Sequence, residues 1–534
     1  MQVEHTVEFK VNINNSSHTV IIPTAGTGSR MGNYTKNLNK ALLPYKNKPV
    51  LSHIIDSFPK DTRFIIPLGY LKEQIINFCA VVYNDRHIEF VDVDDWQGIK
   101  SGTGYTLLQC KDKITSAFWY VPCDTYFDQP VVDKVRDKDC YFVKTVPAQD
   151  THLYTMFDLN NSFYIHDIKF KEETSPKWRA FTGLMYINDY SDFFAKLEAS
   201  NSNEFIGIIK LGSDTADLNT WLDFGNPKVY QTELSKSQKF DFTKKDEVTY
   251  ICNNRVVKWW LDGSVAKKKY DKVLVNPGVF PNNCQYSGNY IAYDFFQGQT
   301  LYEFNNPTAF TPLLDWLETN VWKDCDADIY NASVEFYKTK SLSRINKFLK
   351  KYPNLSPVTN IDGVEVKDYN YYLSKIDWEY LATVTRPGFL HGDLQFDNIV
   401  ISEDLEFKII DWRHEFAGLV EYGDIYYDLA KMAGGFIINY ANIKNHNFNI
   451  EIDNGSVTLS IPNVDHINVY EERLRKYILD NNLDYNKVQQ LIPIIFWNMS
   501  PLHAAPFDTF LWYLGIKLFA ELEKNNVQQR CLLL

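Results

Sequence analysis

The chain has 534 residues, of which 45% are hydrophobic and 23% charged, and its formal net charge is −12 at pH 7. This length predicts more than one folded domain, and the composition is that of an ordinary globular protein, not of a disordered or fibrous one. The negative charge argues against a nucleic-acid partner, because binding to a phosphate backbone normally requires a clustered basic surface. The eight cysteines show no metal-ligand or disulfide-framework spacing, which is typical of a reduced, cytoplasmic protein.

The two ends of the chain carry few signals. Residues 1–18 have charges where a signal peptide has its apolar core, so we expect an N-terminal extension without an assigned role. No apolar run approaches the length that spans a membrane. The last four residues, from Cys531, fit a prenylation pattern, but no polybasic segment precedes them. Since one lipid seldom anchors a protein stably, we expect no stable membrane anchor.

Residues 19–232 alternate between short apolar strands and amphipathic helices. The predicted strands and helices follow in the order strand 18–26, helix 49–58, strand 63–69, helix 71–82, strand 87–93 and strand 117–124. Such alternation implies an α/β domain with a Rossmann-like parallel sheet, whose ligands bind at the carboxyl ends of the strands. A polar stretch, 233–247, is the predicted linker to the rest of the chain.

A glycine-containing loop follows the first predicted strand. Gly26 and Gly28 let backbone N–H groups approach phosphate oxygens closely, and Arg30 is placed to hold the same phosphates. Alone, the pattern fits a tight turn better than a phosphate site, and the third glycine of the dinucleotide motif and a Walker lysine are both absent. Lys40 lies further along, where a lysine can neutralise the charge that builds on phosphorus during nucleotidyl transfer.

Four later segments occur in a fixed order after this loop. They are SGTGYTLLQC at 101–110, WYVPCDTYFD at 119–128, FTGLMYI at 181–187 and TWLDFGNP at 220–227. With GTGSRMG and NKALLPYKNKPVL, this set resembles the sugar-phosphate nucleotidyltransferases, the pyrophosphorylase family. Singly, Asp124 fits a strand-end cap and Asp223 a turn residue about as well as metal ligands. The ordered set is a much stronger indication than any one member.

The resemblance implies roles for individual residues. It assigns catalysis to Arg30 and Lys40, nucleotide binding to Ala25, Gly26, Gly28, Ser29, Gly102 and Thr103, substrate binding to Lys169, Lys171, Thr182 and Gly183, and a Mg²⁺ site to Asp124 and Asp223. It does not decide between Lys169 and Lys171 as the phosphate-binding lysine. The implied reaction is attack of a phosphomonoester oxygen on the α-phosphorus of an NTP, with release of pyrophosphate.

Residues 248–304 are rich in predicted strands, and helices dominate 305–534. EVTYICNNRVVKWWLD predicts a hairpin around an Asn–Asn turn, and its second strand carries Lys258. A lysine at such a position reaches the α and β phosphates of ATP in kinases, although a solvent-facing lysine fits the alternation too. A small β lobe before a larger helical lobe is the coarse pattern of a two-lobed, protein-kinase-like α+β domain.

The segment FLHGDLQFDNIVISEDLEFKIIDW, at 389–412, places Asp393, Asn398 and Asp411 at the ends of two apolar runs. Kinase catalytic loops use this arrangement: one aspartate takes the acceptor's hydroxyl proton, while an asparagine and a second aspartate hold Mg²⁺ on ATP. Gathering carboxylates is costly, and a divalent cation offsets the cost. His391 is expected to have a structural role within the loop.

The sequences HGD and IIDW differ from the HRD and DFG of protein kinases. With YGDIYYDLAKM at 422–432, they resemble the aminoglycoside phosphotransferase and choline kinase superfamily instead. In the last of these segments, Asp424 and Asp428 are expected to cap and buttress the catalytic loop. Trp497, His503, Asp508 and Trp512 are candidates for an acceptor pocket, although such an aromatic stripe at helical spacing more often belongs to a core.

We therefore expect a bifunctional enzyme that phosphorylates a sugar or similar hydroxylated metabolite and then couples the phosphate to a nucleotide. The expected cofactor is Mg²⁺ and the expected substrates are ATP and a second NTP, either CTP, UTP or GTP. Such donors feed surface-polysaccharide or glycoconjugate synthesis in both resembled families. A choline- or ethanolamine-type kinase fused to its cytidylyltransferase is the alternative enzyme, and a regulatory scaffold with an inactive kinase the alternative class. The oligomeric state is not indicated.

Overall fold

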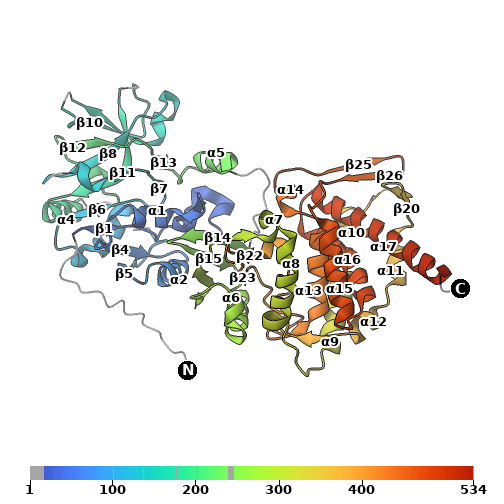
Figure 1. Ribbon diagram of the computed structural model, residues 1–534. Helices are drawn as coiled ribbons and strands as arrows, with labels where there is room; N and C mark the ends of the chain where they lie inside the picture. Colours follow the sequence, from blue (N-terminus) through green and yellow to red (C-terminus); the bar gives the residue numbers. More distant parts are fainter. Residues whose placement is uncertain are drawn as a thin grey trace. The chain divides into compact units, whose positions relative to one another are not determined.

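The computed structural model describes residues 17–99, 101–135, 137–160, 162–175, 177–200, 203–237, 246–355 and 357–532. Most of the predicted N-terminal extension, residues 238–245 of the predicted linker and the side chain of Cys531 lie outside this part. The chain forms two compact units (Figure 1). Unit 1 lies within 17–237, 246–263 and 285–292, and unit 2 within 264–284 and 293–532.

The centre of unit 1 is a mixed sheet with a parallel core. The parallel strands, in the order β6, β1, β4 and β5, are β6 (Phe118–Tyr120), β1 (Thr19–Ile21), β4 (Arg63–Leu68) and β5 (His87–Asp92). Beyond β6 the sheet continues antiparallel, through β11 (Arg179–Ile187), β9 (Thr155–Leu159) and β10 (Ile165–Phe170). Two further strands, β8 (Cys140–Lys144) and β12 (Asp214–Asp217), branch from β11. The predicted parallel sheet is thus confirmed for its first four strands.

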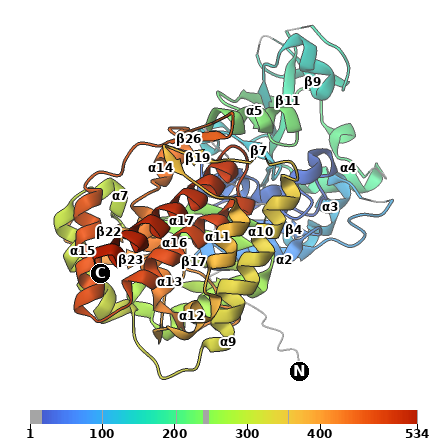
Figure 2. The ribbon, with the colours of Figure 1, turned by 90° about the vertical axis from the view of Figure 1, so that its right-hand side faces the viewer.

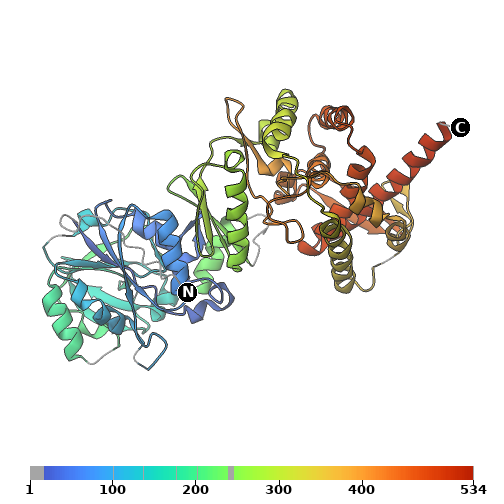
Figure 3. The same cartoon turned by 90° about the horizontal axis from the view of Figure 1, so that it is seen from below.

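Strand side chains alternate between two hydrophobic cores on the two faces of this sheet. Val20 and Ile22 face the core that contains α1 (Val50–Asp56) and α2 (Lys72–Val82), whereas Ile21 faces the core of α3 (Thr103–Gln109) and α4 (Tyr190–Ala199). Because both faces are covered, β6 and most of β1 and β4 are apolar, whereas β5, at the edge of the sheet, carries Glu89 and Asp92. Figure 3 shows the blue-to-cyan strands of this sheet from below.

A second sheet of unit 1 begins with the predicted hairpin. Its strands, in spatial order, are β14 (Glu247–Cys252), β15 (Arg255–Trp260), β17 (Tyr290–Asp294) and β16 (Gln285–Ser287). The hairpin turn is confirmed, because Asn253 and Asn254 have φ of 51° and 59°, the left-handed values that a two-residue turn of type I′ requires. Tyr250 belongs to the α1–α2 core, and its hydroxyl donates to the Leu42 carbonyl at 2.6 Å. Helix α6 (Gly263–Val275) falls almost wholly in unit 2, so the two units divide residues 248–304.

Unit 2 is mainly helical, as predicted for residues beyond 305. Its longer helices are α8 (Phe310–Trp316), α10 (Lys340–Lys351), α13 (Ile425–Gly435), α15 (Ile467–Asp480), α16 (Tyr485–Met499) and α17 (Phe507–Leu532). Helix α16 packs against α13, α10 and α17 (Figure 2). Every residue of α13 is buried, which explains the predominance of apolar and small residues in its sequence.

Short strands complete unit 2. They are β18 (Gln299–Thr300), β22 (Ile399–Ile401) and β23 (Phe407–Ile409) in one sheet, β19 (Asn360–Ile361), β20 (Val364–Glu365), β25 (Asn449–Asp453) and β26 (Ser456–Ser460) in another, and the pair β21 (Pro387–Gly388) and β24 (Gly423–Asp424). Throughout the described part of the chain, no helix combines the length and apolar character needed to cross a membrane. Whether unit 2 is kinase-like stays a prediction.

Candidate functional sites

The loop after β1 in unit 1 is fixed by hydrogen bonds at its start and exposed to solvent at its tip. The backbone and side chain of Thr24 both donate to the Pro67 carbonyl, at 3.0 and 2.8 Å. Ala25 is buried and accepts from the Tyr70 backbone N–H at 2.9 Å. Gly26, in contrast, is exposed, and an added Cβ there meets no atom within 4 Å. The exposed backbone at the tip is therefore available to an anion.

The other predicted residues of this loop lie beside Lys40. Gly28 has φ of +63°, and a Cβ there would lie 3.3 Å from the Lys40 Cβ, so both the conformation and the contact favour glycine. Ser29 and Arg30 begin a short helical turn, 29–34, and are exposed. The guanidinium of Arg30 acts electrostatically on Asp223, which places it toward the carboxylates described below.

Lys40 is held in place by its neighbour, Asn39, which the sequence reasoning did not single out. Asn39 is fully buried, and its side chain donates to the carbonyls of Thr24 at 3.1 Å and Tyr70 at 2.7 Å. These bonds fix the Lys40 segment to the end of β1. The only sequence signal was a short polar side chain directly before the buried run Ala41–Leu43.

Asp124 and Asp223 come together although they are about a hundred residues apart. Two short strands, β7 (Thr125–Tyr126) and β13 (Leu222–Asp223), pair antiparallel and set Asp223 opposite Thr125. A Cβ built on Gly225 would lie 2.5 Å from Asp124 Oδ2, 2.8 Å from Asp223 Oδ1 and 3.0 Å from Lys40 Nζ. Lys40 and Asp124 also form an ion pair. Three charged groups thus converge within 3.0 Å of one point.

The charges at this point are unbalanced. Burial, and then the neighbouring Asp124, raise the pKa of Asp223 to about 6, although Lys40 opposes the shift. Burial alone lowers the pKa of Lys40, but Asp124, with smaller contributions from Cys123 and Asp223, outweighs it and the net pKa is raised. Two carboxylates facing one lysine leave a surplus of negative charge, which suits a hard divalent cation. No cluster of three or more His, Cys, Asp or Glu occurs in the described residues, so other ligands of such an ion would be water and phosphate.

The small residues at the start of α3 have a packing explanation. A Cβ on Gly102 would lie 2.2 Å from the Asn203 carbonyl oxygen, and the Gly104 backbone N–H donates to that oxygen at 2.7 Å. The Thr103 hydroxyl is hydrogen-bonded to Glu204. A predicted contact of Gly102 and Thr103 with a nucleotide stays a prediction.

A cavity of about 650 Å³ opens at the carboxyl ends of β4 and β5. Trp96 forms one wall of this cavity. Gly69 lies between Trp96 and the glycine loop, because a Cβ built on Gly69 would be 2.6 Å from the Ala25 carbonyl oxygen and 2.8 Å from Trp96 Cγ. The rings of Tyr70 and Trp96 are 5.9 Å apart. Trp96 stands in an irregular polar segment, DVDDWQG, where sequence alone gave no reason to select it.

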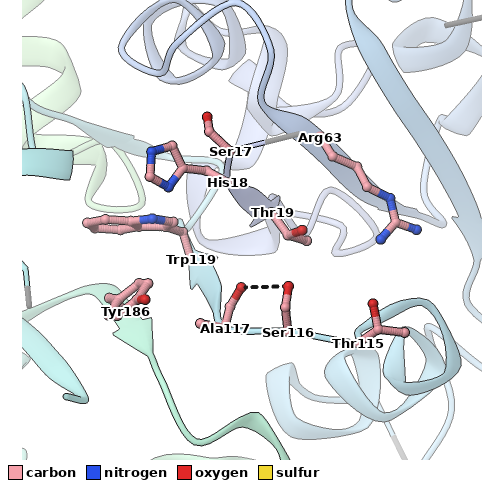
Figure 4. A pocket seen from close by; sticks show the side chains of 9 residues that line it. All are labelled: Ser17, His18, Thr19, Arg63, Thr115, Ser116, Ala117, Trp119 and Tyr186. Carbon is pink, nitrogen blue, oxygen red and sulfur yellow. Dashed lines mark hydrogen bonds between the residues drawn. The ribbon is translucent and has the colours of Figure 1, made fainter. Parts of the chain in front are cut away.

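A second pocket of unit 1, of about 280 Å³, is shown in Figure 4. Its lining includes His18, Thr19, Arg63 and Trp119, residues at or next to the first positions of β1, β4 and β6. It therefore lies at the amino ends of the parallel strands. The carboxylates and the glycine loop are at the carboxyl ends, where open α/β sheets bind their ligands.

The predicted substrate-binding residues Thr182 and Gly183 lie in an irregular part of β11. The Thr182 hydroxyl donates to the Phe142 carbonyl at 2.9 Å, and Gly183 has φ of +84°. A Cβ on Gly183 would lie 2.5 Å from Pro122, two residues before Asp124, so the backbone at this point adjoins the carboxylate strand. Both residues are thus brought toward the predicted metal site.

The two candidate lysines differ in their surroundings. Lys169, on β10, places Nζ 5.3 Å from the Trp178 ring, whereas Lys171 is exposed and its backbone donates to the Tyr154 carbonyl at 3.1 Å. Burial, and then Asp223, raise the pKa of Tyr154 to about 12, so the Tyr154 hydroxyl lies within electrostatic reach of the carboxylate pair. Sequence reasoning missed Tyr154, and the choice between the lysines stays open.

In unit 2, the three predicted kinase residues gather around one loop. Strands β22 and β23 pair antiparallel with Ile399 opposite Ile409, so Asn398 and Asp411 flank the same end of the hairpin. The Asn398 side chain donates to the Asp393 carbonyl at 2.7 Å. Asp411 has φ of +58°, a left-handed conformation that is uncommon outside glycine. Such conformations concentrate at ligand sites.

His391 and Asp428 fix the backbone of this loop. Asp428, from α13, accepts from the backbone N–H groups of His391 and Gly392, each at 2.7 Å. The imidazole Nδ1 accepts from the Asp393 backbone N–H at 3.1 Å, and Nε2 lies 2.7 Å from the Ile410 carbonyl, which requires Nε2 to carry the proton. Burial lowers the pKa of His391 to about 3, so its expected structural role is consistent with a neutral ring.

Asp393 has a cationic partner that the sequence reasoning missed. Lys431 Nζ lies 2.7 Å from Asp393 Oδ1, and the Gln395 side chain donates to the same oxygen at 2.9 Å. Burial raises the pKa of Asp393, but Lys431 and Gln395 outweigh burial and hold it well below its usual range. Asp393 is therefore ionised at neutral pH. Asp424, Asp428 and Lys431 follow an i, i+4, i+7 pattern, which could have identified the lysine.

Asp424, Trp497 and Trp512 occupy structural positions in unit 2. Asp424 caps α13 and pairs with Lys487 at 2.5 Å, with both side chains fully buried. Trp497 and Trp512 are fully buried and stack on each other at 5.3 Å. The aromatic stripe near the C-terminus is accordingly part of the core.

Lys258 lies on β15, in unit 1, and is buried. Its Nζ is 3.6 Å from Glu247 Oε1 on the neighbouring strand. The side chains of Trp259 and Trp260 are buried as well, so this end of the strand does not alternate between core and solvent, and the alternative of a solvent-facing Lys258 does not hold. The role of Lys258 in binding ATP stays a prediction.

Comparisons with known proteins find sequence similarity between the N-terminal part and sugar nucleotidyltransferases. No protein-family model matches the chain. The structure of UDP-glucose pyrophosphorylase complexed with UDP-glucose covers 41% of this chain and 97% of its own at 17% identity, with a TM-score of 0.34. That of the CTP:phosphocholine cytidylyltransferase LicC from Streptococcus pneumoniae covers 40% and 97% at 18% identity, also with a TM-score of 0.34.

Two sequence relatives are more informative. The bifunctional protein GlmU of Methanocaldococcus jannaschii is 29% identical over 175 residues, which are 32% of this chain and 40% of that protein. The UTP–glucose-1-phosphate uridylyltransferase AglF of Haloferax volcanii is 24% identical over 227 residues, 39% of this chain and 91% of that protein. The chain thus spans less than half the length of GlmU. Its N-terminal part is homologous to sugar nucleotidyltransferases.

Proposed function

We propose that the chain is a bifunctional enzyme whose unit 2 phosphorylates a hydroxylated small molecule with ATP and whose unit 1 joins the resulting phosphate to a nucleotide. The product is an NDP-activated donor of the kind used for surface polysaccharides or glycoconjugates. The convergence of Lys40, Asp124 and Asp223 beside Gly225 is the observation that carries the nucleotidyl transfer. The homology of the N-terminal part to sugar nucleotidyltransferases supports it.

In unit 1, an oxygen of the acceptor phosphate attacks the α-phosphorus of the NTP, and pyrophosphate leaves. Asp124 and Asp223 would hold Mg²⁺, which supplies charge neutralisation to the triphosphate when bound. Lys40 stands beside them and stabilises the negative charge that develops on the α-phosphoryl oxygens. The open backbone at Gly26, with Arg30, binds the β and γ phosphates.

The cavity beside Trp96 is the place we propose for the nucleoside. It adjoins Ala25 through Gly69, so a base against the indole would leave its phosphates at the glycine loop. Thr182, Gly183 and either Lys169 or Lys171 would face the acceptor phosphate. The cavity does not distinguish CTP, UTP and GTP.

In unit 2, Asp393 acts as the base that receives the acceptor's hydroxyl proton. Its Oδ1 is engaged by Lys431 and Gln395, which leaves Oδ2 for the proton. Asn398 and Asp411 would hold Mg²⁺, which supplies charge neutralisation to the phosphates of ATP when bound. The loop geometry set by His391 and Asp428 orients Asp393.

Two assays on the full chain test the two halves. Pyrophosphate release from CTP, UTP and GTP with candidate sugar phosphates and phosphocholine tests unit 1, and we expect Lys40→Met and Asp223→Asn to lose it. ADP release with sugars and choline tests unit 2, and we expect Asp393→Asn to lose it while pyrophosphate release is retained. Pyrophosphate release that Lys40→Met and Asp223→Asn leave at the wild-type rate would contradict the proposal for unit 1, and ADP release that Asp393→Asn leaves unchanged would contradict it for unit 2. Activity with choline alone would favour the choline-kinase alternative.

A further inference from the structure

A cluster of four cations lies beside the proposed base of unit 2. It consists of Lys340 and Arg344 on α10, Arg413 after β23 and Lys431 on α13, and is called the cationic cluster below. Lys340 and Arg344 are four residues apart and so share one face of their helix. Lys340 Nζ lies 2.8 Å from the centroid of the Phe336 ring, and the Arg413 guanidinium lies 5.0 Å from the same centroid. One ring thus brings cations from two distant segments together.

The cationic cluster adjoins Asp393. Lys431 contacts the Asp393 carboxylate directly, at 2.7 Å. The Arg413 backbone N–H donates to the His391 carbonyl at 2.9 Å, and a Cβ on Gly392 would lie 2.6 Å from the Arg413 Cβ. Asp393 also acts electrostatically on Arg344. Whatever binds between these cations therefore lies close to the Asp393 carboxylate, whose Oδ1 contacts Lys431 and whose Oδ2 receives the acceptor's proton.

Three of the four cations form no ion pair with any of the described residues. Within that part of the chain, no ion pair of 4.0 Å or less involves Lys340, Arg344 or Arg413. Arg344 donates only to the Asn498 backbone carbonyl, at 3.3 Å, and Lys340 faces the rings of Phe336 and Tyr427. Cation–π contacts of this kind offset part of the cost of burial. They do not neutralise these cations as an anion would, and Asp393 and Glu415 act on Arg344 and Arg413 electrostatically without forming an ion pair with them.

The cost of this arrangement is visible in the ionisation of the cluster. Burial, and then Arg413, Arg344 and Lys431, lower the pKa of Lys340 well below its usual value. Burial, and then Arg413, lower the pKa of Arg344. Like charges gathered at partly buried positions are destabilising unless an anion completes them.

We infer that the acceptor phosphorylated by unit 2 carries an anionic group, a carboxylate or a phosphate, which the cationic cluster binds while the acceptor's hydroxyl faces Asp393. This inference rests on the kinase function proposed above for unit 2. In the reaction, the hydroxyl oxygen forms a bond to the γ-phosphorus of ATP and the bond from that phosphorus to the bridging oxygen breaks. ADP leaves, and the hydroxyl proton passes to Asp393 Oδ2. A quaternary ammonium such as choline is disfavoured, because four cations would repel it.

Matched acceptor pairs test the charge preference with the full chain. ADP release is measured with glucose against glucuronate and glucose 6-phosphate, glycerol against glycerate, and choline. We expect kcat/KM to be at least about tenfold higher for anionic members, because charge-assisted hydrogen bonds to Arg and Lys exceed neutral ones. Comparing the sugar acid with the sugar phosphate distinguishes a carboxylate from a phosphate. A preference for neutral or cationic acceptors overturns this inference alone, whereas no ADP release with any acceptor overturns the kinase function as well.

Variants of the cluster separate acceptor binding from ATP binding. We expect Arg344→Gln and Lys340→Met to raise KM for the anionic acceptor about tenfold or more and to leave KM for ATP within about twofold of wild type. Lys347→Gln, an exposed cation on the same helix, is the matched control and should change neither value. Arg344→Lys should restore part of the acceptor affinity if the variant fold is intact. A rise in KM for ATP with an unchanged acceptor KM assigns the cluster to the γ-phosphate and overturns the inference.

Discussion

Replacing Asp223 with asparagine removes one of the two carboxylates that converge beside Gly225. Burial and Asp124 raise the pKa of Asp223 from 3.8 to about 6. A shift of about two units corresponds to about 3 kcal/mol of penalty on the charged form, at about 1.4 kcal/mol per unit. Because folding raises this pKa, the penalty is complete above pH 6 and declines as the pH falls toward 3.8.

Without divalent cations, the Asp223→Asn variant should therefore be more stable than wild type. We expect its free energy of unfolding in urea and EDTA to exceed that of wild type by up to about 3 kcal/mol at pH 7.5 and by about half as much at pH 5. Mg²⁺ should stabilise wild type and not the variant, since the second ligand is lost. The Asp128→Asn variant, which changes an exposed carboxylate, is the control. Equal or lower stability of Asp223→Asn in EDTA would refute the argument from surplus negative charge.

Three further predictions concern single contacts. Lys431→Met removes the cation that holds the pKa of Asp393 down, so the rate of ADP release should fall about tenfold or more. The acidic limb of its pH–rate profile should move to higher pH, and an unmoved limb contradicts the prediction. Gly225→Ala should lower pyrophosphate release at least about 100-fold, because its Cβ enters the point where the charges meet, whereas Gly207→Ala, with open space around it, should be silent. Lys487→Met leaves the buried Asp424 carboxylate without its cation and should lower the free energy of unfolding, measured in urea, by about 3–5 kcal/mol. A change below about 1 kcal/mol would show that this ion pair is dispensable for stability.

Strands and motifs of unit 1 were accessible from the sequence because their signals are local. The buried strand before Gly26 and the hairpin turn at Asn253 both follow from short-range rules of periodicity and backbone conformation. The approach of Asp124 to Asp223 could be expected only through the resemblance. No local rule pairs strands that are about a hundred residues apart, and the antiparallel half of the sheet escaped prediction for the same reason.

The surroundings of Asp393 show the same limit in unit 2. The catalytic-loop pattern itself is compact, and the structure brings Asn398 and Asp411 to one end of a hairpin, as the spacing indicated. The cationic cluster, in contrast, draws on residues from 340 to 431 that are ordinary lysines and arginines in the sequence. Only burial and the shared Phe336 ring set them apart, and neither can be read from composition or spacing.

The hairpin of β14 and β15 follows the polar stretch 233–247 in the chain, yet it contributes Tyr250, Cys252 and Val257 to the α1–α2 core. A chain that ended before this hairpin would lack part of the hydrophobic core of unit 1. It would also lack the hydrogen bond from the Tyr250 hydroxyl to the Leu42 carbonyl. Unit 1 could not be separated from the rest of the chain at the polar stretch 233–247 without losing these core residues. The strands that the sequence assigned to the kinase-like lobe are therefore inherited with the interior of unit 1.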